Sequence, residues 1–163
     1  MGPKFPIIFP NLQEKVESKP ECLRYIIYIL MGTEVIKEKM KSLIILDDYA
    51  TELNKCIKEG NGYVVSKMEY YSHKPYGQVY KIFSERYNIE KKDPKFFDDL
   101  KDLCEKRNEI AHDAVIKHLG DIEKANSDIK PFVLQNSMNH IQKKLTDIFN
   151  EKAKSFNKQA ELV

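Results

Sequence analysis

Apolar residues that recur every three or four positions constrain the fold of this chain more than any other feature. The clearest run has spacings of four, three, three, four, three and four: Ile36, Met40, Leu43, Leu46, Ala50, Leu53 and Ile57. A stripe of this period lies along one face of an α-helix. Thr33 is suited to cap the start of this helix, and Gly60 and Gly62 are suited to end it.

Apolar spacing and helix-breaking residues predict further helices before and after this segment. Residues 11–31 form an expected first helix, with Pro20 either bending it or starting its better half and Gly32 closing it. Residues 63–92 contain Pro75 and Gly77 as breakers and predict two shorter helices.

Two later segments begin with strong helix signals. Asp93 followed by Pro94 is an N-cap with proline at the first helical position, and a stripe of Phe96, Leu100 and Leu103 follows. Asp128 and Pro131 open the last helix, whose apolar stripe again alternates spacings of four and three: Leu134, Met138, Ile141, Leu145 and Ile148.

Length and composition agree with this helical pattern. A chain of 163 residues suits one domain, and six Gly and seven Pro are too few for a sandwich or barrel with many tight turns. No segment is a convincing strand. We expect an all-α antiparallel bundle of about five helices, with an extended N-terminal arm over 1–10, one helical domain over 11–157 and a C-terminal tail over 158–163.

Several classes of protein are disfavoured. Three widely spaced cysteines predict neither a disulfide scaffold nor a zinc site, and the four histidines are not spaced as metal ligands, so no metal or cofactor is expected. The most apolar stretch, 23–31, is too short to span a bilayer, and no signal peptide is evident. We therefore expect a cytoplasmic protein without membrane attachment. A formal charge of +2 argues against non-specific coating of nucleic acid.

The arginines stand out because the chain has 24 lysines and three arginines. Arg107 continues the apolar stripe of the helix that starts at Pro94, where a charge is costly unless it has a partner, solvent or a ligand. Asn108 follows it, and His112 lies one turn beyond Asn108 on the same face. Pairing with Asp47 or Asp48 is the structural alternative for Arg107.

The segment from Arg107 to His112, Arg-Asn-Glu-Ile-Ala-His, resembles the active-site motif of the HEPN superfamily, in which an arginine and a polar residue precede a histidine inside an all-helical domain. That resemblance implies a metal-independent endoribonuclease of the toxin–antitoxin or antiviral defence type, with Arg107, Asn108 and His112 as catalytic residues. It also implies a homodimer with a composite active site. In the branch whose antitoxin modifies a tyrosine two residues after the histidine, that tyrosine is present; here the position is Ala114, so this route of regulation is not expected.

The residue chemistry suits such a reaction. Histidine moves protons near neutral pH, and a guanidinium holds a phosphate and stabilises its transition-state charge. Glu109 and Asp113 flank the motif as candidate supporting residues that tune His112. A nuclease of this kind needs restraint, so an inhibitory or activating partner protein is also expected.

Other interpretations stay open. Lys91, Lys92 and Lys95 follow a tyrosine-rich stretch and are candidates for RNA binding, because aromatic rings stack on bases and lysine neutralises phosphate. Packing at the edge of the core is the preferred interpretation of the tyrosines. The bundle as a whole is alternatively a non-catalytic HEPN-type module that binds RNA or protein, or a helical adaptor in which the motif is a coincidence.

Overall fold

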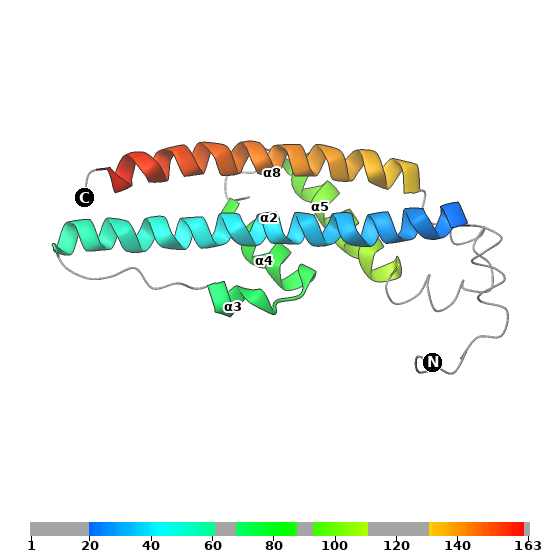
Figure 1. Ribbon diagram of the computed structural model, residues 1–163, viewed down its shortest axis with the longest axis horizontal. Helices are drawn as coiled ribbons and strands as arrows, with labels where there is room; N and C mark the ends of the chain where they lie inside the picture. The colour runs from blue at the N-terminus through cyan, green and yellow to red at the C-terminus, as the bar shows by residue number, and fades with distance from the viewer. Residues whose placement is uncertain (1–19, 61–67, 88–92, 111–130, 162–163) are drawn as a thin grey trace, which may run out of the picture.

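The computed structural model describes residues 20–60, 68–87, 93–110 and 131–161, and within these ranges the secondary structure is five helices with no strand (Figure 1). The helices are α2 (Pro20–Glu59), α3 (Met68–Ser72), α4 (Tyr76–Tyr87), α5 (Pro94–Asn108) and α8 (Pro131–Ala160). The predicted all-α bundle is therefore confirmed for the described residues, as are the two short helices between Gly60 and Asp93.

The two long helices α2 and α8 lie side by side and run in the same direction (Figure 1). Lys39 donates to Thr146 at 2.6 Å, and further along both helices Lys152 donates to Asp47 at 2.7 Å. Helix α5 runs against both, because the segment α3–α5 returns the chain to the end at which α2 begins. The expected antiparallel packing thus applies to α5, whereas for α2 and α8 it is wrong.

The helix ends follow local signals at three places. Asp93 Oδ1 accepts from the Phe96 amide at 3.1 Å, and Pro94 occupies the first turn of α5, as predicted. Pro20 is the first residue of α2, which leaves the predicted segment 11–19 outside the described residues. Gly60 ends α2 with a φ of 69°, a left-handed value that glycine adopts without strain.

The prediction that Gly32 ends a helix and Thr33 starts another is wrong, because α2 continues through both. A Cβ on Gly32 would lie 2.8 Å from Met138 Sδ of α8, so the glycine allows two helices to approach closely. Thr33 is fully buried and donates from its hydroxyl to the Leu30 carbonyl at 2.8 Å instead of capping a helix.

The core lies between α2, α4, α5 and α8. It contains the predicted residues of each stripe, fully or almost fully buried: Ile36, Met40, Leu43, Phe96, Leu100, Leu103, Met138, Ile141 and Leu145. The α2 stripe leaves the core toward its C-terminal end, where Ile57 is 42% exposed. The predicted tail from residue 158 is still helical at Ala160.

Candidate functional site

Arg107 lies on the last turn of α5, with its side chain partly buried against α2. Its Nη2 is 3.5 Å from Glu34 Oε1, and 27% of the side chain is exposed. Glu34 also forms an ion pair with Lys37 and is itself 45% exposed, so its charge is shared between two cations. A pair this long and this exposed to water adds little to stability.

One nitrogen of Arg107 has no acceptor among the residues that the structure describes. The Nε atom is buried and makes no hydrogen bond to any described residue. A buried N–H without a partner is uncommon in folded proteins, because its desolvation is not compensated. The guanidinium is thus partly exposed, and its Nε–H is a donor that the described residues leave unused.

The prediction that Arg107 pairs with Asp47 or Asp48 is wrong. Asp48 pairs with Arg86, and Asp47 accepts from Tyr87 and Lys152, so neither carboxylate contacts Arg107. Glu34 takes that place because it lies nearer the N-terminal end of α2, level with the end of α5. Glu34 and Arg107 are 73 positions apart, so no local sequence pattern indicates this pair.

Asn108 and Glu109 complete the described part of the motif. Asn108 is exposed, and its Oδ1 accepts from Arg107 Nη1 at 3.3 Å, which leaves its amide nitrogen available as a second donor. Glu109 is also exposed, and its Oε2 lies 2.6 Å from Lys106 Nζ. The amide of Glu109 donates to the carbonyls of Glu105 and Lys106, and the helix widens to a π-turn at Glu109 and the fully buried Ile110.

The remaining motif residues, His112 and Asp113, lie outside the described residues, as do Lys91 and Lys92. The structure therefore brings together Arg107 and Asn108 from the predicted set. Burial raises the pKa of the Cys104 thiol, and the nearby positive charge of Arg107 opposes part of that rise. The Arg107 charge thus acts on the Cys104 thiol, one turn earlier on α5.

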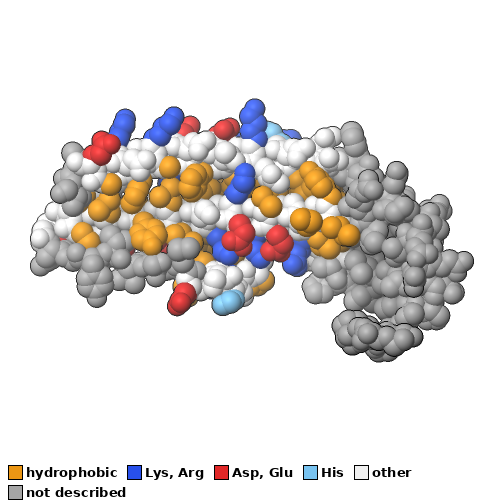
Figure 2. Space-filling view, viewed as in Figure 1, with side chains coloured by type: hydrophobic (Ala, Val, Ile, Leu, Met, Phe, Trp, Pro, Cys, Tyr) orange, Lys and Arg blue, Asp and Glu red, His pale blue; other side chains and the backbone are white. Residues whose placement is uncertain are grey.

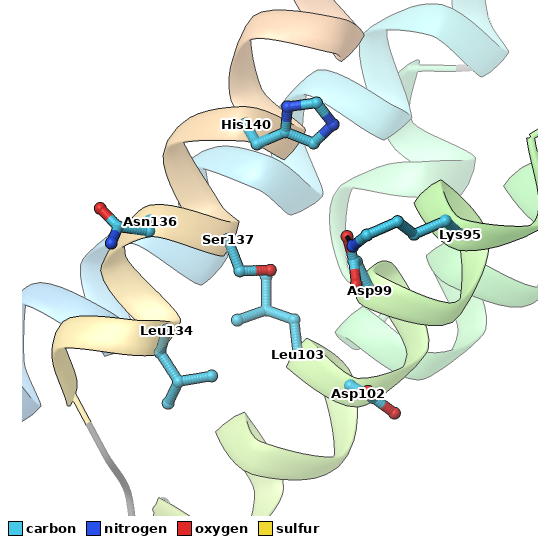
Figure 3. Close-up of a pocket in the computed structure, with 8 residues that line it drawn as sticks. All are labelled: Lys95, Asp99, Asp102, Leu103, Leu134, Asn136, Ser137 and His140. Atoms are coloured by element: carbon cyan, nitrogen blue, oxygen red, sulfur yellow. Dashed lines mark hydrogen bonds and ion pairs between the residues drawn. The ribbon is translucent and has the colours of Figure 1, made fainter.

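Lys95, the third candidate for RNA binding, lies in a groove of about 460 Å³ between α5 and α8 (Figure 3). Its Nζ is 2.7 Å from Asp99 Oδ2. The groove is also lined by Asp102, Asn136 and His140 over the apolar side chains Leu103 and Leu134. With two carboxylates against one lysine, this groove does not favour a phosphate backbone.

A second polar cluster, which the sequence analysis missed, joins α2 to α3 and α4. Arg86 Nη1 donates to Asp48 Oδ1 at 2.8 Å and to the Ile44 carbonyl at 3.2 Å, and its Nη2 donates to the Tyr71 hydroxyl at 3.2 Å. Tyr71 in turn donates to Asp48 Oδ2 at 2.8 Å. Arg86 thus needs the guanidinium fork, and its arginine identity was the available signal.

The tyrosines around this cluster are mostly packing residues. Tyr71 and Tyr76 are buried, and Tyr87 packs its ring on Phe83 while donating to Asp47 and to the Leu43 carbonyl. Burial and the neighbouring Asp47 carboxylate raise the pKa of Tyr87 well above its usual range. Tyr70 differs, since it is 64% exposed with Lys74 Nζ 4.1 Å from its ring centroid.

Among the described residues, no group of three or more His, Cys, Asp or Glu side chains is placed to hold a metal ion. None of the helices in the same residues combines the length and the apolar character needed to cross a membrane.

Comparison with known proteins adds no relatives: no family model matches the chain, and neither the curated proteins nor the solved structures give a match.

Proposed function

We propose that this protein is a HEPN-type, metal-independent endoribonuclease that acts as a toxin or phage-defence effector. One observation carries the proposal: Arg107 has a buried Nε–H with no acceptor among the described residues, at a surface-accessible helix end. Asn108 beside it offers a further donor, and His112 follows five residues after Arg107 in the sequence.

The chemistry assigns each residue a role. A histidine accepts the proton of the RNA 2′-hydroxyl, the 2′-oxygen attacks the adjacent phosphorus, and the bond from phosphorus to the 5′-oxygen breaks. A second proton donor protonates the leaving 5′-oxygen, so the products carry 2′,3′-cyclic phosphate and 5′-hydroxyl ends. Arg107 stabilises the charge on the non-bridging oxygens, and its planar fork does so better than a lysine.

A single His112 does not supply both the base and the acid in one step. A homodimer solves this if two copies of the motif face one cleft across a two-fold axis. The proposal therefore includes a homodimer with RNA as substrate, and a partner protein that inhibits or activates it.

The test is cleavage of a fluorescent single-stranded RNA in the presence of EDTA, with product ends identified by mass spectrometry. We expect cyclic phosphate ends with the unaltered protein and a rate at least ~100-fold lower for His112→Ala and Arg107→Ala, as for loss of a general base or a transition-state donor. Cleavage that EDTA abolishes, or that survives both substitutions, would refute the proposal.

Two variants control for charge. Arg107→Lys keeps the positive charge without the fork, and we expect it to remain strongly impaired. Lys106→Ala removes one positive charge from the neighbouring position, where the side chain pairs with Glu109, and we expect near-normal cleavage. Equal losses in Lys106→Ala and Arg107→Ala would indicate a general charge effect.

The ion pair between Arg107 and Glu34 favours a second candidate, a non-catalytic module that binds RNA or protein, or a helical adaptor. In that case Arg107 serves to hold α5 against α2. RNA binding or partner binding that persists without product, together with a lower stability of Arg107→Ala, would support it.

A further inference from the structure

Two arginine–carboxylate pairs join α2 to α4 and α5, and they differ in how firmly the carboxylate is held. Arg86 meets Asp48 at 2.8 Å, and only 14% of the Asp48 side chain is exposed. Tyr71 donates to the second oxygen of Asp48, so both oxygens are hydrogen-bonded within the protein. Arg107 meets Glu34 at 3.5 Å, and 45% of the Glu34 side chain is exposed. The first carboxylate is fixed on both oxygens, whereas the second is loosely held and open to water.

Glu34 contacts its arginine with one oxygen. Its Oε1 lies 3.5 Å from Arg107 Nη2, and its Oε2 pairs with Lys37 Nζ on the same helix. Nε and Nη2 lie on one edge of a guanidinium, and Arg107 Nε has no acceptor among the described residues. A guanidinium binds a carboxylate or a phosphate best when two parallel N–H groups reach two oxygens at about 2.7–2.9 Å. Glu34 thus uses one of the two donors on this edge, and at a longer distance.

Lys37 keeps Glu34 paired when the contact with Arg107 breaks. The two residues are three positions apart on α2, so their ion pair does not depend on α5. An exposed pair such as that of Glu34 with Arg107 contributes little free energy. Figure 2 shows a group of acidic and basic side chains at the surface near the middle of α2. Exchange of the carboxylate for another anion on Arg107 therefore costs little and leaves no buried charge alone.

We propose that Glu34 takes the place of a phosphate on Arg107 in the free protein, and that a phosphodiester of bound RNA displaces it onto Lys37. This inference rests on the proposed function, because it takes RNA as the ligand. The displaced carboxylate stays beside the bound phosphate, and its negative charge lowers the affinity for RNA. Glu34 is therefore an inhibitory residue of the site, with which the strand competes for Arg107.

Equilibrium binding of a fluorescent 2′-O-methyl RNA tests the exchange, because this strand lacks the attacking hydroxyl and stays intact. We expect Glu34→Gln to bind it about 5-fold more tightly than the unaltered protein does. Loss of a competing exposed ion pair accounts for a factor of this order, and loss of a negative charge beside the phosphate acts in the same direction. No detectable binding by the unaltered protein or by Glu34→Gln would overturn the proposal.

Glu38→Gln is the matched control. Glu38 pairs with Lys41 at the same spacing of three residues and is 57% exposed, but it contacts no arginine among the described residues. Its removal changes the net charge by the same amount one turn away, and salt screens that general effect. We therefore expect Glu38→Gln to change RNA affinity by less than ~2-fold at physiological salt.

Arg107→Ala identifies the group for which Glu34 and the strand compete. In that background Glu34→Gln should tighten RNA binding no more than Glu38→Gln does, because no guanidinium remains to exchange. Equal gains for Glu34→Gln with and without Arg107, or equal gains for the two glutamine variants, would overturn the proposal. Inorganic phosphate as a competitor separates a strand from a free anion. Displacement of the RNA by micromolar phosphate would assign the site to the free ion and refute its assignment to RNA.

Cleavage kinetics separate this proposal from the nuclease itself. We expect Glu34→Gln to lower KM about as much as it lowers the dissociation constant and to leave kcat within ~2-fold, because the carboxylate competes only for binding. A fall in kcat would place Glu34 in the reaction and refute the exchange. Tighter binding by Glu34→Gln in a protein that cleaves no RNA retains the exchange and refutes the nuclease. Cleavage with no difference between Glu34→Gln and Glu38→Gln does the opposite.

Discussion

Replacement of Gly32 by alanine tests how α2 and α8 pack. The added Cβ would lie 2.8 Å from Met138 Sδ and 3.1 Å from its Cε, closer than non-bonded carbon and sulfur atoms approach. Met138 is fully buried in the core, so its side chain has little room to move away. Either the methionine leaves its rotamer or the two helices separate.

Two effects of opposite sign determine how much Gly32→Ala changes the free energy of unfolding. Alanine in place of glycine within a helix stabilises by about 1 kcal/mol. Overpacking of a filled core destabilises by about 1–3 kcal/mol. We therefore expect Gly32→Ala to lower the free energy of unfolding by up to about 2 kcal/mol, although the helix propensity alone predicts a gain.

A double-mutant cycle separates the two effects. Met138→Ala alone should destabilise by about 2–5 kcal/mol, because it leaves a cavity. Once the methionine is shortened, Gly32→Ala meets no clash, so in that background it should stabilise by about 1 kcal/mol. Gly77→Ala is the control, since a Cβ there would lie at an ordinary 3.8 Å from Cys104 Sγ and should be neutral or slightly stabilising.

The measurement is urea unfolding followed by circular dichroism at 222 nm for the four members of the cycle. We expect a coupling energy of at least about 1 kcal/mol between positions 32 and 138. If Gly32→Ala stabilises the unaltered protein as much as it stabilises the Met138→Ala variant, the close approach does not constrain the helices.

Two further predictions concern the polar cluster of α2 and α4. The folded state raises the pKa of Tyr87, so this tyrosine contributes stability that is present below pH ~10 and lost as the pH rises further. Tyr87→Phe should therefore make the loss of stability shallower by up to ~1.4 kcal/mol per pH unit, measured by urea unfolding between pH 9 and 11. Plots of unfolding free energy against pH that run parallel for the two proteins would contradict this prediction. Arg86→Lys cannot reach Asp48, the Ile44 carbonyl and Tyr71 together, and should destabilise by about 1–3 kcal/mol. The exposed Lys81→Ala on the same helix should change stability by less than about 0.5 kcal/mol, and an equal effect of both variants would argue against the cluster.

Features that depend on neighbours in the sequence were predictable. The stripe of α5 and the middle of the α8 stripe are buried as their spacing indicates, and the Asp93–Pro94 start of α5 and the Gly60 end of α2 lie where expected. Each rests on the helix period or on a hydrogen bond between residues a few positions apart, so the sequence contains the whole signal.

The candidate site was predictable only in its residue types. The interruption of an apolar stripe singled out Arg107, and its position at a partly buried helix end fits that reading. Its partner Glu34 was not predictable, and neither was the role of Arg86, two of whose acceptors, Asp48 and the Ile44 carbonyl, lie on α2 about forty residues earlier. Which carboxylate meets which guanidinium depends on how far each helix extends and how the helices are offset, and the local sequence carries no record of that offset.

By itself, then, the sequence determined that this chain forms helices, where most of them begin and end, and which faces are apolar, because these properties arise within single turns of the backbone. Tertiary structure alone decided that Gly32 is a contact between α2 and Met138 of α8 and not a helix end. It also decided that α2 and α8 run parallel and that the apolar side chain of Met31 stays exposed. These outcomes depend on the volume and charge that distant segments bring to the same place, which is a property of the packed molecule.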